Sequence, residues 1–411
     1  MARRDQYLVG LDVGTSKVVV VVGDASDPAG IDLVGYGVAE SRGVRRGDIV
    51  NLDDAVQAIR RAVAEAEQMA GIDIDTVYLG VSGTRLKGFN SRGVVAVTGR
   101  NREVTREDVT RAIDAAKGFT LPTGQELLHV LPQDFVVDEH DGIQSPVGMT
   151  GSRLEVNVHI ITGNQTATAN LETCVNRAGM HVAETVVDQV ASADAVLSAD
   201  EKELGVALVD IGAGTVNLAI FDRGTLWHTA VKPLGGDHFT NDIHVALRTP
   251  LPDAEKLKRR AGCALASMIL DDEMIEVPSV GGRPPRTFAR RSVAEFLQPR
   301  GEELFHLVWD EICTAGYERH LNAGLVLTGG GANLYGMADL AEHIFKMPVR
   351  VGVPEHVGRL SDHLATAEFS TGVGLVLYGY QRLTAAGLQP RHRPGVAGVW
   401  DRCTDAFRKW M

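Results

Sequence analysis

The chain of 411 residues carries 41 Lys and Arg against 53 Asp and Glu, a formal charge of −12 with neutral His. This acidic total disfavours a nucleic-acid-binding protein, which normally presents a basic surface. Hydrophobic residues make up 44% and charged residues 23%, ordinary values for a globular protein, and the length predicts about two to three domain-sized units.

The four cysteines lie far apart and form no C-x-x-C pair, which disfavours a disulfide framework or a structural zinc site. The first residues, MARRDQYLVGLDVG, lack the apolar core and cleavage site of a secretory signal. No apolar run approaches the roughly 20 residues that span a bilayer. We therefore expect a reduced, cytoplasmic protein.

The first part of the chain predicts an α/β layer that begins with a hairpin. β-branched runs at 7–13 and 18–22 flank a polar turn, and further strands are expected at 33–39 and 76–81. Between these two, Asn51 caps a helix whose apolar residues share one face. A hairpin start differs from the βαβ crossover of a dinucleotide-binding fold.

From residue 84 to about 161 the pattern changes to short alternations around a capped helix at 105–117, with prolines as breaks. This predicts an inserted small α+β subdomain. Helices at 166–178 and 188–197 lead to a strand at 206–210, where the α/β layer resumes.

The second half repeats the opening. LVDIGAGTVNLAIF, at 208–221, again places an apolar-Asp-apolar-Gly sequence at a strand end, before a polar turn and another strand. Two such hairpins predict a duplicated domain with a ligand held between the copies. The more polar stretch 241–299 predicts a second small subdomain, 325–337 a buried strand with a triple-glycine turn, and 370–380 a helix.

Three glycine-rich turns are candidates for binding phosphate, because backbone N–H groups reach phosphate oxygens best where no side chain intervenes. The turns consist of Gly14, Thr15, Ser16 and Lys17; of Gly212, Gly214 and Thr215; and of Gly235, Gly236 and Asp237. Asp12 and Asp210, at two strand ends, are placed to hold a hydrated Mg²⁺ ion.

Taken singly, each turn is more often an ordinary tight connection, and a lysine or aspartate there is more often solvated or turn-capping. Three such turns in this order favour the phosphate interpretation. The sequence has no G-x-x-x-x-G-K-[ST], and its near matches to G-x-G-x-x-G at Gly212, Gly329 and Gly372 lack the final glycine. A Walker or Rossmann site is therefore disfavoured.

In this order, GLDVGTSK, LVDIGAGT and LTGGGANLYGM resemble the two phosphate motifs and the adenosine motif of the actin-like ATPase superfamily. Other segments, over nearly the whole chain, resemble the bacterial FtsA cell-division family: RGVRRGDIVNLDDAV, VYLGVSG, SPVGMTGSRLEV, ELGVALVDIG, DAEKLKRRAGCA and VPSVGGRPPR. The resemblance implies an α/β, actin-like two-lobed ATPase fold with an inserted small α+β subdomain and a C-terminal amphipathic helix.

The expected organisation has two lobes and two smaller units. The first lobe comprises 1–83 and 162–197, the insert 84–161, the second lobe 198–240 and 304–383, its small subdomain 241–303, a linker 384–395 and the amphipathic helix 396–411.

The resemblance implies binding of ATP with Mg²⁺ between the lobes, with Asp12 and Asp210 at the metal. The expected nucleotide-binding residues are Asp12, Gly14, Thr15, Ser16, Lys17, Asp210, Gly212, Gly214, Thr215, Gly235, Gly236, Glu255, Lys258, Gly329, Gly330, Gly331 and Asn333. Glu255 and Lys258, one helical turn apart, would face the ribose and adenine. Without the resemblance they would be interpreted as a surface ion pair.

Two positions depart from the family pattern. Ala213 stands where glycine is common, and Asn217 stands where many relatives have an acid, so Asn217 supplies no negative charge for a metal or a water. Asp188 and Gln189 are the nearby candidates to orient an attacking water, although either could be a helix N-cap. We expect nucleotide binding with at most weak hydrolysis.

The C-terminal segment 396–411 follows a linker rich in Pro, Gly and Arg and predicts an amphipathic helix. At about 100° per residue its apolar positions form one stripe. The stripe includes Val399, Trp400, Cys403, Phe407 and Trp410. Such a helix usually packs on its own domain, but the linker and the two tryptophans favour a helix lying in the plane of a membrane, as the resemblance also implies.

The resemblance implies a peripheral adaptor that self-associates, tethers the tubulin-like protein FtsZ to the inner face of the cytoplasmic membrane at the septum, and helps recruit later division proteins. Arg286 and Arg300 lie in the subdomain expected to bind the FtsZ C-terminal peptide, and a basic patch suits an acidic partner. Arg300 could instead hold the subdomain together through an ion pair. The alternatives are a soluble ATP-dependent kinase or a pilus-assembly protein of the same superfamily.

Overall fold

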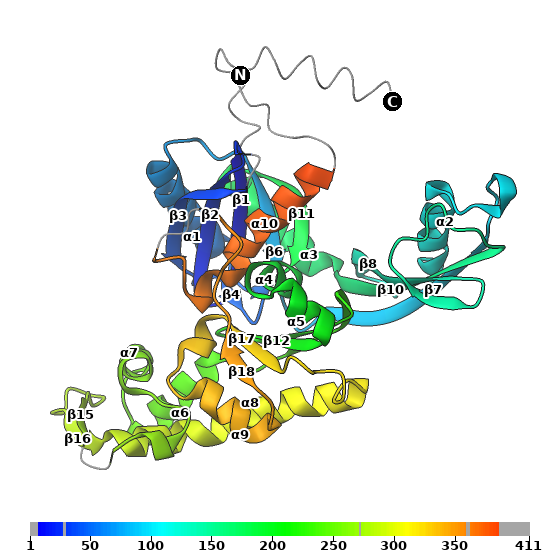
Figure 1. The fold of residues 1–411 in the computed structure, drawn as a ribbon. Helices are drawn as coiled ribbons and strands as arrows, with labels where there is room; N and C mark the ends of the chain where they lie inside the picture. Colours follow the sequence, from blue (N-terminus) through cyan, green and yellow to red (C-terminus); the bar gives the residue numbers. More distant parts are fainter. Residues whose placement is uncertain (1–6, 28–29, 271–272, 359–361, 386–411) are drawn as a thin grey trace.

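The computed structural model describes residues 7–27, 30–270, 273–358 and 362–385 (Figure 1). Two α/β lobes lie one above the other, and a smaller unit extends from the upper lobe to one side. The predicted two-lobed fold with an insert is confirmed. The predicted membrane residues Val399, Trp400, Cys403, Phe407 and Trp410 lie outside the described residues.

The first lobe is built on a five-stranded sheet of order β11-β6-β1-β2-β3. Its strands are β1 (Tyr7–Val13), β2 (Lys17–Asp24), β3 (Asp32–Glu40), β6 (Thr76–Val81) and β11 (His181–Val187). The first three pair antiparallel, whereas β6 and β11 continue the sheet in parallel. Val18 to Val22 are all fully buried, as expected for a strand covered on both faces.

Helices α1 (Leu52–Ala70) and α3 (Gln165–Ala178) pack together beside this sheet. As predicted, Asn51 caps α1, by accepting hydrogen bonds from the backbone N–H groups of Asp53 and Asp54. Gly71 ends the helix in the left-handed conformation.

The second lobe repeats this architecture in a sheet of order β14-β13-β12-β17-β18. Its strands are β12 (Val206–Ile211), β13 (Val216–Asp222), β14 (Thr225–Lys232), β17 (Leu325–Thr328) and β18 (Val349–Val351). The first three again pair antiparallel and the last two in parallel. Helices α4 (Asp188–Val196) and α10 (Ser370–Ala385) pack against each other, in a hydrophobic core that joins residues of both lobes.

The insert has an antiparallel sheet of order β7-β10-β8-β9. Its elements are β7 (Lys87–Ala96), α2 (Arg106–Ala116), β8 (Gln125–Val137), β9 (His140–Ile143) and β10 (Arg153–Asn164). Thr105 and Asp108 form a capping box at the start of α2, and the unit has its own hydrophobic core. It contacts the second lobe through β14.

The remaining elements surround the second sheet or connect the parts. They are β4 (Val44–Arg45), β5 (Asp48–Ile49), α5 (Ala199–Leu204), α6 (Gly236–Leu247), α7 (Leu251–Ala261), β15 (Met274–Val277), β16 (Arg286–Ala289), α8 (Arg290–Ala315) and α9 (Met337–Phe345), with the short 3₁₀ turns η2 (Arg100–Arg102), η3 (Ala266–Met268), η4 (Gly330–Asn333) and η5 (Ala367–Phe369). The domain boundaries expected after residues 240 and 303 fall inside α6 and α8, so both helices run across them.

Candidate nucleotide-binding cleft

The first two predicted phosphate turns have the same backbone geometry. The Gly14 N–H donates to the Lys17 carbonyl at 3.0 Å, and the Gly212 N–H donates to the Thr215 carbonyl at 2.9 Å. A Cβ on Gly14 would lie 2.9 Å from the Lys17 oxygen, too close for any side chain. The two turns therefore occupy equivalent places in equivalent hairpins.

These turns meet across the boundary between the lobes. A Cβ on Gly214 would lie 2.9 Å from Thr15 Oγ1, so the two turns face each other at contact distance. The third predicted turn is bonded to the second, because the Gly236 N–H donates to the Gly212 carbonyl and the Asp237 N–H to the Ala213 carbonyl, both at 2.9 Å. The structure thus brings all three turns together.

Three carboxylates lie beneath the turns, and burial raises the pKa of each. Asp12, which keeps partial exposure, has its pKa raised to about 7 by burial and by the charge of Asp210, against the opposing effect of Lys17. Burial raises the pKa of Asp210 to about 6. The pKa of Asp188 is raised well above its usual value by burial and by the other two carboxylates. A bound cation would stabilise all three in the ionised form.

Two residues that the sequence did not single out hold Asp210 in place. Ser192 Oγ donates to Asp210 Oδ2 at 3.1 Å, and Thr371 Oγ1 lies 3.5 Å from the same oxygen. Gly329, with φ of +80°, passes so close that a Cβ there would overlap Asp210 Oδ1. The adenosine-motif turn therefore lies directly against a predicted metal ligand.

Asp188 and Gln189 begin α4, whose N-cap is Val187, so neither residue is the N-cap. Asp188 Oδ1 and Gln189 Oε1 are buried and have no hydrogen-bond partner within the described part of the chain. Buried acceptors normally have a partner, and a bound water or hydrated ion would supply one. Their assignment to water orientation stays a prediction.

The carboxylates fit a hydrated Mg²⁺ ion better than a fully protein-ligated metal. Within the described ranges, no group of three or more His, Cys, Asp and Glu side chains is arranged to ligate one ion. Mg²⁺ commonly keeps several waters and takes one or two carboxylates together with phosphate oxygens. Asp12 and Asp210 match that donor set.

Lys17, the cation of the first turn, is already paired. Its Nζ lies 2.5 Å from Glu368 Oε2 and 4.4 Å from the centre of the Phe369 ring. Glu368 belongs to η5, which is remote in sequence and was not predicted.

The predicted ribose and adenine residues adjoin the third turn. Lys258 Nζ donates to the Gly236 carbonyl at 3.0 Å and lies 2.7 Å from a Glu255 oxygen. Burial alone would raise the pKa of Glu255, but Lys258 and its other hydrogen bonds lower the pKa to about 2. Only 14% of the Lys258 side chain is exposed, so this is more than a solvated surface pair. Gly330 and Asn333, on η4, are exposed.

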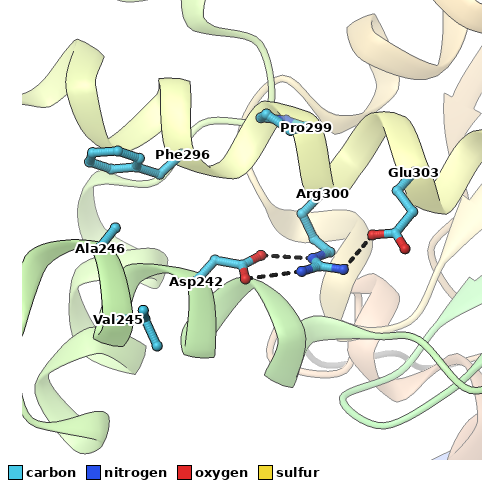
Figure 2. A pocket seen from close by; sticks show the side chains of 7 residues that line it. All are labelled: Asp242, Val245, Ala246, Phe296, Pro299, Arg300 and Glu303. Carbon is cyan, nitrogen blue, oxygen red and sulfur yellow. Dashed lines mark hydrogen bonds and ion pairs between the residues drawn. The ribbon is translucent and has the colours of Figure 1, made fainter.

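The two arginines predicted to bind a partner lie in a different region, Arg300 between α6 and α8 and Arg286 on β16, against the end of α6. Figure 2 shows Arg300 between Asp242 and Glu303, and its bonds to the two Asp242 oxygens measure 2.7 and 3.0 Å. The ion-pair alternative for Arg300 is thus confirmed. Arg286 donates to Ser279 Oγ at 3.2 Å and to the Leu247 carbonyl.

A pocket of about 340 Å³ lies beside Arg300. Its lining residues are Asp242, Val245, Ala246, Phe296, Pro299, Arg300 and Glu303. Val245 and Phe296 are 64% and 41% exposed, so the pocket combines apolar and charged surface.

Among the described residues, no helix is both long and apolar enough to cross a bilayer.

Comparisons with known proteins agree with this architecture. Residues 207–374 match the family model described as "Cell division protein FtsA", and residues 83–162 match "SHS2 domain inserted in FTSA". The chain is 48% identical over 377 residues to the cell division protein FtsA of Pseudomonas aeruginosa. The aligned residues make up 92% of this chain and 90% of that protein.

Three solved structures, of two kinds of protein, share the fold at low identity. The PilM-PilN type IV pilus biogenesis complex has a TM-score of 0.66 at 18% identity, covering 91% of this chain and 98% of that chain. MreB5 of Spiroplasma citri has TM-scores of 0.52 bound to ADP and 0.51 bound to AMPPNP, each at 14% identity and covering 93% of this chain and 97% of that chain.

Proposed function

Since the chain belongs to the FtsA family of actin-like cell-division proteins, we propose that it is an ATP-binding adaptor that attaches FtsZ to the inner face of the cytoplasmic membrane at the septum. The observation that carries the ATP-binding part of the proposal is the meeting of two equivalent glycine turns from different lobes, with 2.9 Å between a Gly214 Cβ position and Thr15 Oγ1. Such facing turns would grip a polyphosphate from both sides.

In the nucleotide site, Thr15 and Gly214 would contact phosphates through backbone N–H groups, while Gly14 and Gly212, whose N–H groups are bonded inside their turns, would let the phosphates approach without a side chain in between. Asp12 and Asp210 would hold hydrated Mg²⁺, whose charge would neutralise phosphate oxygens. The MreB5 neighbour, solved with ADP and AMPPNP, supports a nucleotide in this fold. Asp188 and Gln189 would orient a water, with only weak hydrolysis expected.

Gly330 offers a direct test of ATP binding. A Cβ there meets only Glu368 Cβ, at 3.8 Å, so Gly330→Ala should leave both the fold and ATP affinity intact. Gly330→Asp adds a negative charge beside Glu368 and the expected base, and we expect it to abolish ATP binding in a folded protein. Calorimetry showing equal ATP affinity for the two variants would refute this site.

The pocket between α6 and α8 is the proposed binding site for the FtsZ C-terminal peptide. Because Asp242 and Glu303 already compensate the charge of Arg300, exposed apolar surface should contribute much of the affinity. We expect Phe296→Ser or Val245→Ser to weaken peptide binding, measured by fluorescence anisotropy. Leu307→Ser, at another exposed apolar position on α8, is the control and should leave affinity unchanged.

Arg286 adds positive charge to the same subdomain. Arg286→Glu should weaken peptide binding and make it less sensitive to salt, because a charge attraction is lost. Arg300→Glu would strengthen this effect, but it would also leave Asp242 without its partner, so Arg286 gives the cleaner single variant. Unchanged affinity in both would assign the partner to another surface.

The C-terminal segment 396–411 is proposed as the membrane anchor. Fully burying a large apolar side chain contributes at most about 1.5 to 3 kcal/mol, so several residues of the stripe must act together. Trp400→Glu or Phe407→Glu should release the protein from sedimenting anionic vesicles, whereas Arg408→Ala, on the polar side, should only weaken binding. Sedimentation of both Glu variants with vesicles would exclude the stripe as the anchor.

Self-association into filaments is proposed to use the insert, which extends away from both lobes (Figure 1). Head-to-tail contacts between copies need not close into a ring. Replacing residues 84–161 with a short linker should preserve ATP binding and abolish filaments on lipid. Normal filaments in electron micrographs would exclude this surface. Recruitment of later division proteins would follow from the same assembly.

A further inference from the structure

A small hairpin crosses between the lobes at the phosphate turns. Strands β4 and β5 pair antiparallel, with Val44 opposite Ile49 and Arg45 opposite Asp48. The two residues between them, Arg46 and Gly47, have φ of +52° and +81°. Positive φ at both central residues characterises a type I′ turn, which accepts glycine easily and arginine only with strain. The tip of the hairpin is therefore held in one specific conformation.

The tip lies against residues of both lobes. A Cβ on Gly214, in the second phosphate turn, would lie 3.1 Å from both Arg46 N and Arg46 Cα. On the other side, a Cβ on Gly47 would lie 2.5 Å from the Ser82 carbonyl oxygen. Thr15 adjoins the same Gly214. The backbone of Arg46 thus lies where the two phosphate turns meet.

The position of the tip along the phosphate chain follows from its neighbours. Gly212 and Ala213 are bonded to the third turn, next to Lys258 and the expected ribose and base. Gly214, the next residue, faces the hairpin instead. The hairpin therefore adjoins the part of the turn that lies away from the base, where a terminal phosphate would lie.

The two lysines near the phosphate turns already form ion pairs. Lys17 pairs with Glu368, and Lys258 pairs with Glu255. Arg46 is exposed, and its guanidinium makes no hydrogen bond or ion pair with any described residue. A triphosphate between the turns would meet Asp12 and Asp210 beneath it, so it needs a cation in addition to Mg²⁺.

We propose that Arg46 binds the terminal phosphate of a nucleoside triphosphate and so discriminates triphosphate from diphosphate. This inference rests on the nucleotide site proposed above and adds a residue from a separate element to it. A guanidinium presents a fork of donors that matches phosphate oxygens. The contact forms only when the third phosphate is present, so it strengthens the binding of ATP and leaves the binding of ADP unchanged.

The test compares AMPPNP and ADP, each with Mg²⁺, by calorimetry on the full chain. Arg46→Asn is the informative variant, because Asn-Gly is a preferred type I′ pair and should preserve the hairpin. We expect its AMPPNP affinity to fall about tenfold, the worth of one charge-assisted hydrogen-bonded contact, and its ADP affinity to change less than about twofold. Arg46→Lys should recover part of the loss.

Arg45→Gln is the matched control, because Arg45 is the exposed neighbour on the same hairpin, and it should leave both affinities unchanged. Equal AMPPNP-to-ADP affinity ratios in the Arg46→Asn variant and the unaltered protein would overturn the assignment. An unaltered protein that binds neither nucleotide would instead refute the nucleotide site itself, so the two failures are distinguishable.

Discussion

The sheets of the two lobes share one architecture, and their equivalent turns differ at three of four residues. In the first lobe the turn reads Gly14, Thr15, Ser16 and Lys17, and in the second it reads Gly212, Ala213, Gly214 and Thr215. The first carries side chains with hydroxyls and a cation, whereas the second is nearly bare backbone. Thr15 and the β4–β5 hairpin can therefore lie close to the second turn. A copy of the second turn in place of the first would lack the hydroxyl of Thr15 and the charge of Lys17.

One buried histidine of the insert bonds to the first lobe, and another bonds to the second lobe. His129 Nε2 accepts the Val187 N–H of the first lobe at 3.0 Å, and His159 Nε2 lies 2.9 Å from Thr229 Oγ1 of the second lobe. Burial lowers the pKa of His129 to about 4 and that of His159 to about 3. Nearby, Glu184 opposes the shift at His129, while Arg382 reinforces it. His228 lowers the pKa of His159 further.

Acid should therefore lower the free energy of unfolding, because protons bind these histidines more readily in the unfolded chain, and this is the largest effect we expect. Each histidine is neutral when folded and has a pKa near 6.5 when unfolded, so its full contribution is present above about pH 6.5 and is lost as pH falls towards 4. From pH 7.5 to 5 the free energy of unfolding should drop by about 2 kcal/mol for each histidine. Urea denaturation at the two pH values measures this loss.

His129→Gln isolates the first-lobe contact, because glutamine can accept the same backbone N–H without titrating. Its loss of stability on acidification should be smaller by about 2 kcal/mol. His306→Gln, at an exposed histidine on α8, should leave the pH dependence as it was. An identical pH dependence in all three proteins would mean that His129 takes up its proton without unfolding.

Exchanging the third residue of the turns tests the comparison of the lobes directly. Gly214→Ser places a Cβ 2.9 Å from Thr15 Oγ1 and 3.1 Å from the Arg46 backbone, so the hairpin must move. Overpacking of this kind costs about 1 to 3 kcal/mol, and we expect ATP affinity to fall about tenfold. Ser16→Gly, the reverse exchange at an exposed residue, should change the affinity less than about twofold. Calorimetry giving equal effects would show that the turns are interchangeable.

The sheets were predictable because each half of the sequence contains a β-branched run, a glycine turn and a second β-branched run, a pattern that local chemistry alone explains. The insert was predictable from a change in periodicity after residue 84. The expected boundaries after residues 240 and 303 ignored α6 and α8, because a helix that passes between two subdomains has no compositional break.

The partners of the cleft residues were not predictable in this way. Lys17 and Glu368 are 351 residues apart, and Thr371 is 161 residues from Asp210, so no sequence spacing signals that they meet. The β4–β5 hairpin was different, since Arg46-Gly47 between Val44 and Ile49 has the form of a two-residue hairpin turn. This turn signal stands in the sequence, although the predicted strands did not include the hairpin.

The smallest effect concerns the fourth residue of the turn, where Lys17 faces Glu368 and the second lobe has Thr215. Both side chains of the pair are partly exposed, at 22% and 34%, so the pair itself contributes at most about 1 kcal/mol. Glu368→Gln keeps the shape of the side chain and frees the lysine charge for phosphate. We expect ATP affinity at low salt to rise about two- to fivefold, and the gain to shrink at high salt. Lys17→Met in the same background should remove the gain, because the lysine is what carries it. Calorimetry that finds weaker ATP binding in Glu368→Gln would mean that the pair orients Lys17 rather than competes for it, and the first-lobe turn would then depend on η5 as closely as the second depends on Thr15.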